Sequence, residues 1–163
     1  MNAPGGQTYF DELLWVHGMV RRDLAKVREL AAELGNGMPA DEVQAELEDL
    51  RANGPLWHLK LNCLHYCRFV HAHHGAEDRM LFPALRASHP DLVPAIDQLE
   101  SEHRQVSGLL DTVEAAAKDL PGGDDGEGRA RVADALEELA DHLLRHLEFE
   151  EESLAEAMRA MKV

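Results

Sequence analysis

Residues 71–78 read HAHHGAED and place three histidines and two carboxylates within eight residues. His73 and Glu77 are four residues apart, a spacing that puts two side chains on the same side of an α-helix with Cβ atoms about 5–6 Å apart. The same His-x-x-x-Glu spacing returns at His146 and Glu150. The stretch therefore predicts helices that bring imidazoles and carboxylates together, and the alternative is a charged helix face in contact with water.

Hydrophobic spacing extends this helical prediction to the whole chain. Apolar residues recur at intervals of three and four, and no run alternates with a period of two, so we predict an all-α fold. Four long antiparallel helices form an up-down-up-down bundle, a single domain over residues 1–163. The long helices are expected at 8–34, 56–87, 91–120 and 129–161, and a short acidic helix is expected at 40–52 in the first connection. Thr8 is the predicted N-cap of the first helix, and Pro83 is predicted to kink or break the second.

Charge and composition exclude several classes of partner. Sixteen Lys and Arg residues stand against 31 Asp and Glu residues, which gives a net charge of −15 and disfavours nucleic acid and anionic membranes. No apolar run reaches the roughly eighteen residues of a membrane span, and the first residues lack the pattern of a secretory leader. We expect a soluble cytoplasmic protein. Cys63 and Cys67 lack the CxxC spacing and are expected to be core thiols.

Two pairs of helices repeat one pattern. When His17 is aligned with His103, apolar residues coincide at offsets 3, 7, 10, 14 and 17, which lie on one helical face, so both histidines are predicted to point into the core. When His73 is aligned with His146, further pairs coincide: Glu77 with Glu150, Asp78 with Glu151, Leu81 with Leu154 and Ala84 with Ala157. Each half thus supplies one inward histidine and one His-x-x-x-Glu pair.

These residue types predict a metal centre. Two carboxylates inside a bundle repel each other and lose hydration, and a pair of cations bridged by both would relieve that cost. Nitrogen and oxygen donors suit iron or manganese, with zinc as a competitor. The predicted ligands are His17, His73, Glu77, His103, His146 and Glu150.

Three further residues are candidates for binding the metal or for contacting its ligands. His74 lies about 100° around the helix from its neighbour in the chain, so we expect it beside the ligands or on the surface. His142 stands one turn before the histidine of the fourth helix, where packing or hydrogen bonding is favoured over ligation. Tyr66 is expected to fill the core, and the alternative is a hydrogen bond to a bound oxygen species. Glu100 and Glu102 are candidates to orient imidazoles.

Four segments are similar to the hemerythrin-like HHE cation-binding domains of bacteria. They are the position of His17 in the first helix, HHGAEDRMLFPAL at 73–85, EHRQV at 102–106 and HLEFEE at 146–151. The resemblance covers nearly the whole chain, and the second segment is highly specific for that family. It implies a non-haem di-iron centre, bridged by an oxo or hydroxo group and two carboxylates, that reacts with dioxygen, peroxide or nitric oxide.

Two positions depart from the oxygen-carrying members of that family. Those proteins have a second histidine where this chain has Ser107, and an aspartate where it has Glu151. Glu150 is then the expected bridging carboxylate. The missing imidazole favours sensing, turnover of peroxide or nitric oxide, or iron handling over reversible oxygen storage.

The leading hypothesis is a di-iron protein that binds dioxygen, peroxide or nitric oxide, and reduction of the bound molecule is an extension of that hypothesis. One alternative is an iron or redox sensor that acts through a partner protein. Another is a bundle held together by structural zinc, without redox chemistry. The sequence assigns no catalytic residue and no oligomeric state.

Overall fold

The computed structural model describes residues 8–35, 55–119 and 126–161. Its long helices are α1 (Tyr9–Gly35), α3 (Pro55–Ala76), α5 (Val93–Lys118) and α6 (Gly126–Arg159). A π-helical turn, η2 (Glu77–Leu81), joins α3 to α4 (Phe82–Ser88), and a 3-10 turn, η3 (Pro90–Leu92), leads into α5. The all-α prediction is confirmed. The short helix predicted at 40–52 lies outside the described residues.

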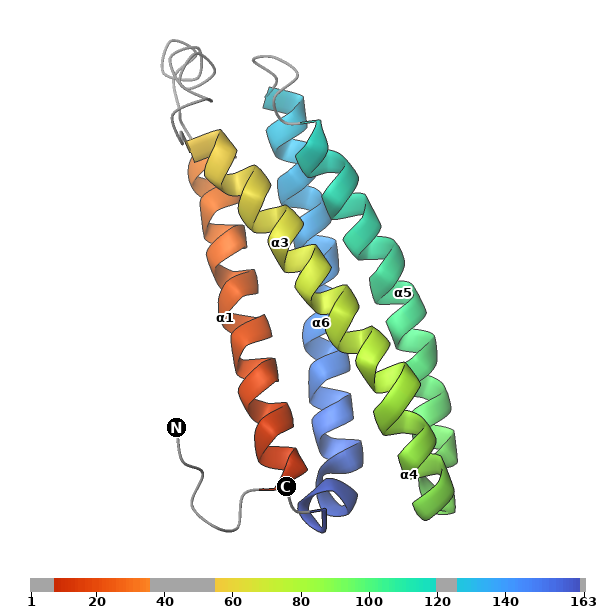
Figure 1. The fold of residues 1–163 in the computed structure, drawn as a ribbon. Helices are drawn as coiled ribbons and strands as arrows, with labels where there is room; N and C mark the ends of the chain where they lie inside the picture. The colour runs from red at the N-terminus through yellow and green to blue at the C-terminus, as the bar shows by residue number, and fades with distance from the viewer. Residues whose placement is uncertain (1–7, 36–54, 120–125, 162–163) are drawn as a thin grey trace.

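The long helices form an up-down-up-down bundle (Figure 1). Helices α1 and α5 each pack against both α3 and α6. The two ends of the described chain meet, because the backbone N–H of Tyr9 donates to the carbonyl of Met161 at 3.1 Å. Within the described residues, every helix is too short or too polar to cross a lipid bilayer.

Thr8 and Asp11 close the start of α1. The backbone N–H of Asp11 donates to Thr8 Oγ1 at 3.2 Å, and the backbone N–H of Thr8 donates to Asp11 Oδ2 at 2.9 Å. These reciprocal bonds satisfy two N–H groups that have no partner within the helix. The prediction of Thr8 as the N-cap is confirmed.

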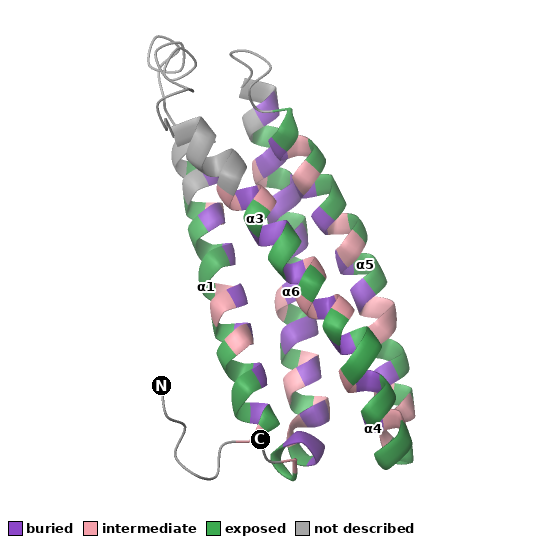
Figure 2. Cartoon of the chain, in the orientation of Figure 1, coloured by how far each residue is buried: buried purple, intermediate pink, exposed green. Residues whose placement is uncertain are grey.

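A layer of polar side chains divides the buried core into two apolar clusters. The larger cluster contains Val20 and Val106, and the smaller cluster contains Leu13 and Leu99. Along α1 and along α5, a buried histidine lies between these apolar positions, and buried residues recur along the described part of each long helix (Figure 2). The polar layer is therefore shielded from water on both sides, so its charges have to be balanced from within.

The π-helical turn aligns the polar layer with the smaller cluster. The backbone N–H of Phe82 donates to the carbonyl of Glu77, five residues earlier. Residues five apart share a face across such a turn, and Glu77, Phe82 and Leu85 are all buried. Pro83 was predicted to kink or break this helix. A break does not occur, because the helix continues to Ser88, and we attribute its passage through Pro83 to the wider turn just before it.

The extra residue of this turn also corrects the predicted repeat. Leu81 was aligned with Leu154, and Ala84 with Ala157, without a gap. In the structure Leu81 is only partly buried and Ala84 is exposed. Phe82 and Leu85 join Leu154 and Ala157 in the smaller cluster instead. The correspondence between the two halves therefore shifts by one residue after Glu77.

Cys63 and Cys67 are free thiols in the larger cluster, and both are fully buried. Burial raises the pKa of each thiol to about 12. Since the thiolate is the reactive form, burial keeps these cysteines in the less reactive thiol form at neutral pH. The prediction of core thiols is confirmed.

Candidate metal centre

Five imidazoles and two carboxylates meet in the polar layer. They come from all four sides of the bundle: His17 from α1, His73 and His74 from α3, Glu77 from η2, His103 from α5, and His146 and Glu150 from α6. Nine of their side-chain atoms are buried without a hydrogen-bond partner, namely each imidazole Nε2 and both oxygens of each carboxylate. Buried polar atoms are nearly always paired in folded proteins. So many unpaired atoms facing one another indicate a place for cations.

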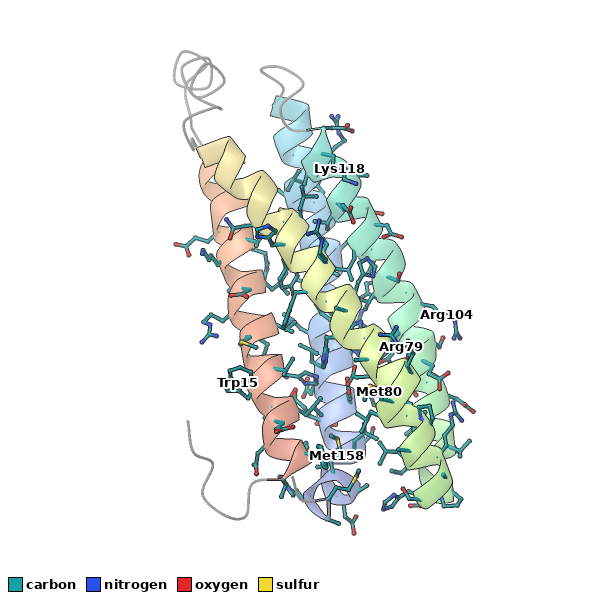
Figure 3. The ribbon with its side chains drawn as sticks, viewed as in Figure 1. Trp15, Arg79, Met80, Arg104, Lys118 and Met158 are labelled. Carbon is teal, nitrogen blue, oxygen red and sulfur yellow. The ribbon has the colours of Figure 1, made fainter. Side chains whose placement is uncertain are left out.

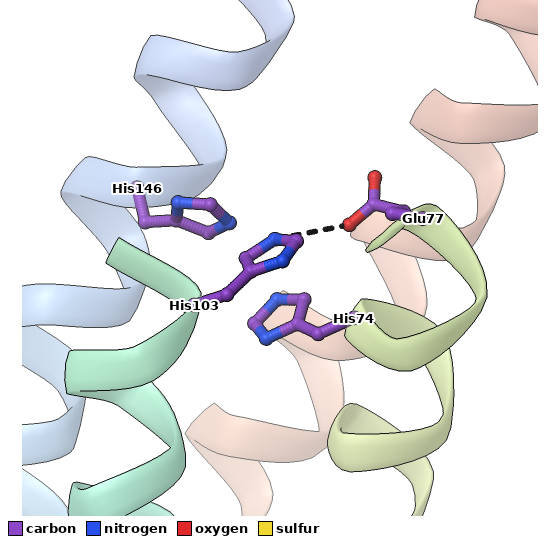
Figure 4. Close-up of side chains that lie close together, drawn as sticks. All are labelled: His74, Glu77, His103 and His146. Carbon is purple, nitrogen blue, oxygen red and sulfur yellow. Dashed lines mark ion pairs between the residues drawn. The ribbon is translucent and has the colours of Figure 1, made fainter. Parts of the chain in front are cut away.

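One group of donors contains three imidazoles (Figure 4). It consists of His74, Glu77, His103 and His146, whose ligand atoms all lie within 4.8 Å of one another. The Nε2 of His103 is 3.3 Å from Glu77 Oε1. The ring of His74 stacks on that of His103, with centroids 4.0 Å apart and planes at 12°.

A second group contains two imidazoles and shares Glu77 with the first. Its ligand atoms come from His17, His73 and Glu77, again within 4.8 Å, and His73 Nε2 is 3.4 Å from Glu77 Oε1. Glu150 Oε2 lies 3.7 Å from the Nε2 of His17 and 3.4 Å from that of His146. Each glutamate therefore contacts one imidazole of each group, as two carboxylates placed between two cations would.

Three carboxylates stand behind the imidazoles and orient them. The Nδ1–H of His103 donates to Asp78, that of His146 to Glu102 and that of His17 to Glu151, each at 2.8 Å. A donated Nδ1–H fixes the tautomer and leaves the Nε2 lone pair pointing into the centre. These three imidazoles are thus prepared to bind a cation.

Burial also sets the protonation of the centre. It lowers the pKa of His73 to about 4 and that of His74 further, so both rings are neutral at pH 7. Burial raises the pKa of Glu77 well above its usual range, and the neighbouring Glu150 raises it more. Without a cation, Glu77 therefore keeps its proton to a higher pH than an ordinary glutamic acid does.

The family of the chain accounts for this arrangement. A family model described as "Hemerythrin HHE cation binding domain" matches residues 8–158. The chain belongs to the hemerythrin HHE family. Comparisons with curated proteins and with solved structures return no match. The match to the HHE model spans all seven converging side chains, and the six of them that form the two donor groups could hold metal.

The sequence interpretation left open whether His74 of this HHE domain binds the metal. We expected it beside the ligands or on the surface, because it is rotated from His73. In the structure it is buried, and its Nε2 faces the centre without a partner. The signal that could have found it is the spacing of three residues to Glu77, which also puts two side chains on one helical face.

The other candidates lie outside the two donor groups. Tyr66 is buried in the larger cluster, where its hydroxyl donates to the carbonyl of Val20 at 3.3 Å, in line with the expected core role. His142 lines a pocket of about 370 Å³ beside Glu102 and His146. Glu100 does not orient an imidazole, because it binds Arg86 at 2.6 Å instead.

An apolar pocket of about 360 Å³ borders the two-imidazole donor group of the HHE domain. His73, whose side chain keeps 12 % of its surface exposed, is part of its lining. Met80 and Met158, labelled in Figure 3, also line it. The remaining lining residues are Tyr9, Glu12, Leu13, Val16, Ala76, Leu81, Ala84 and Met161.

Proposed function

We propose that this HHE domain holds two iron ions and, with them, binds and reduces dioxygen, peroxide or nitric oxide. The observation that carries the proposal is the set of nine buried polar atoms with no hydrogen-bond partner. We assign His74, His103 and His146 to one ion, and His17 and His73 to the other. Glu77 and Glu150 would bridge the two ions.

The chemistry of the donors supports this assignment. Imidazole nitrogen and carboxylate oxygen suit iron, manganese and zinc, whereas both cysteines lie in the larger apolar cluster. The charges of the carboxylates also suit two divalent ions. Five ionised carboxylates in and behind the centre, less the one arginine that binds them among the described residues, give a charge of minus four, equal and opposite to two divalent cations. These groups are Glu77, Asp78, Glu102, Glu150, Glu151 and Arg21.

The unequal number of imidazoles supports reactivity at one ion in particular. With both glutamates bridging, the three-imidazole position has five protein ligands and the two-imidazole position has four. The two-imidazole position therefore has more room for a small molecule. Bound iron supplies electrons and an open coordination position. The apolar pocket beside His73 would admit small neutral molecules and disfavour hydrated ions.

Metal analysis of protein produced with iron and zinc both supplied tests the proposal. We expect two iron ions per chain, and ultraviolet charge-transfer bands that change when the reduced protein meets dioxygen, peroxide or nitric oxide. His17→Ala should lower the iron content, whereas His65→Ala, an exposed histidine on α3, should not. A colourless protein with two zinc ions would support the structural zinc bundle. Bound iron without any reaction would favour the sensor, and protein that binds no metal would contradict all three.

A further inference from the structure

Only one of the three carboxylates behind the imidazoles is paired with a cationic side chain in the described part of the chain. Glu151 Oε2 accepts a hydrogen bond from Arg21 Nη2 at 2.6 Å and another from His17 Nδ1 at 2.8 Å. A single oxygen atom thus connects the guanidinium to the imidazole. Asp78 and Glu102 have no ion pair with lysine or arginine among the described residues, and Glu102 accepts instead from the neutral amide of Gln98 at 3.0 Å.

The arginine changes what its carboxylate does for the histidine. A carboxylate that accepts the Nδ1–H of a ligating histidine makes that imidazole a stronger electron donor to the metal. A guanidinium on the same oxygen draws negative charge toward itself in a charge-assisted bond. Glu151 retains 18 % side-chain exposure and Arg21 38 %, so solvent screens this interaction only in part. His17 should therefore donate less to its ion than His103 and His146 donate to theirs.

We propose that Arg21 is a positioning residue that acts through Glu151 and His17 to make the two-imidazole metal position the more electron-poor of the pair. The inference rests on the proposed di-iron function. That position has one fewer imidazole, and its His73 borders the apolar pocket, so the arginine reinforces an inequality already present in the donors. An ion held by His17 and His73 would then be the more easily reduced of the two.

The chain supplies a matched control on the same two helices. Arg28 of α1 binds Glu137 of α6 through two hydrogen bonds, at 2.9 and 2.8 Å. Like Arg21, it links α1 to α6 with a partly exposed guanidinium. Glu137, however, has no histidine behind it among the described contacts. Arg28→Gln therefore removes a comparable helix-to-helix ion pair without touching the centre.

The first measurement uses zinc, which is diamagnetic and has no redox chemistry. In proton–nitrogen spectra of the zinc-loaded protein, the Nδ1–H proton of His17 should move downfield in Arg21→Gln, because Glu151 becomes a stronger acceptor. It should stay in place in Arg21→Lys and in Arg28→Gln. An upfield shift or a lost signal would mean that Glu151 leaves His17, and an unchanged signal would mean that Arg21 has no influence. Either result would overturn the proposal.

The second measurement uses iron-loaded protein whose metal content and circular dichroism match those of the wild type. Arg21→Gln should lower the first reduction potential, whereas Arg21→Lys and Arg28→Gln should leave it unchanged. An equal potential in all four proteins would contradict the role of Arg21. If the protein takes up zinc but no iron, the proposed function fails while the zinc spectra still decide the role of Arg21. If it binds no metal, both proposals fail.

Discussion

Replacing both bridging glutamates by methionine should make the metal-free protein more stable. The double variant Glu77→Met with Glu150→Met keeps side-chain length and removes four buried oxygens that lack hydrogen-bond partners. A buried polar group left unsatisfied costs about 1–3 kcal/mol, so two carboxyl groups cost about 2–6 kcal/mol. The substitution also removes contacts of 3.3–3.7 Å to four imidazoles, which are too long to be strong hydrogen bonds.

We expect a net gain of about 2 kcal/mol in the free energy of unfolding, similar to the gains of about 1–4 kcal/mol when buried ion pairs are replaced by apolar residues. For a chain of this size, the midpoint of thermal unfolding would rise by about 4–8 °C.

Guanidinium denaturation with a chelator present, followed by circular dichroism, measures this difference. Glu148→Met, at an exposed position two residues before Glu150, controls for the change of residue type and should alter stability by less than about 0.5 kcal/mol. Added metal should stabilise the wild type and leave the double variant unaffected. The reasoning is refuted if the double variant, in chelator, is less stable than the wild type. That result would show that the carboxyl groups are well satisfied without a cation.

Three further predictions concern the centre and the core. His74→Leu should weaken metal binding by at least about tenfold, because even the loss of a residue that only supports a ligand lowers metal affinity by about that factor, whereas His65→Leu should not weaken it. Equal zinc affinities of the two variants, measured in competition with a chromogenic chelator, would show that His74 does not bind the metal. Metal binding should release protons and strengthen as pH rises, because Glu77 has a raised pKa and must lose its proton to the solvent. Calorimetry in two buffers of different ionisation enthalpy counts these protons, and identical heats would contradict a protonated Glu77 in the metal-free protein. Leu143→Ala should destabilise the protein by about 2–5 kcal/mol in chemical denaturation, because this side chain is fully buried in the larger cluster, and a loss under 1 kcal/mol would contradict tight packing there.

The features predictable from sequence are those that depend on one helix at a time. Hydrophobic spacing locates the long helices because each must bury one face. The spacing of four residues identifies His73 with Glu77, and His146 with Glu150, because the geometry of a single helix brings each pair together. The polar layer follows from the same reasoning, since His17 and His103 stand on apolar faces.

The remaining features depend on contacts between helices or on backbone irregularity. The bond from Arg21 to Glu151 joins α1 to α6 across 130 positions in the chain, and no local pattern connects such residues. The spacing of His74 to Glu77 allows an inward ring, but the contacts of that ring with His103 of α5 and His146 of α6 depend on how the helices pack. The one-residue shift after Glu77 comes from the π-helical turn, which ideal helical spacing does not anticipate.

That wide turn has a consequence for variation in chain length. A helix rotates by about 100° per residue, so an insertion or deletion elsewhere in α3 would turn every later side chain away from its neighbours. Between Glu77 and Leu81 the helix already contains one residue more than a regular turn needs. Deleting an exposed residue there, such as Met80, would restore regular geometry and still leave Glu77, Phe82 and Leu85 facing inward. Related chains that differ by one residue can therefore accommodate the change at this point, next to the metal centre, while both halves of the helix keep their contacts.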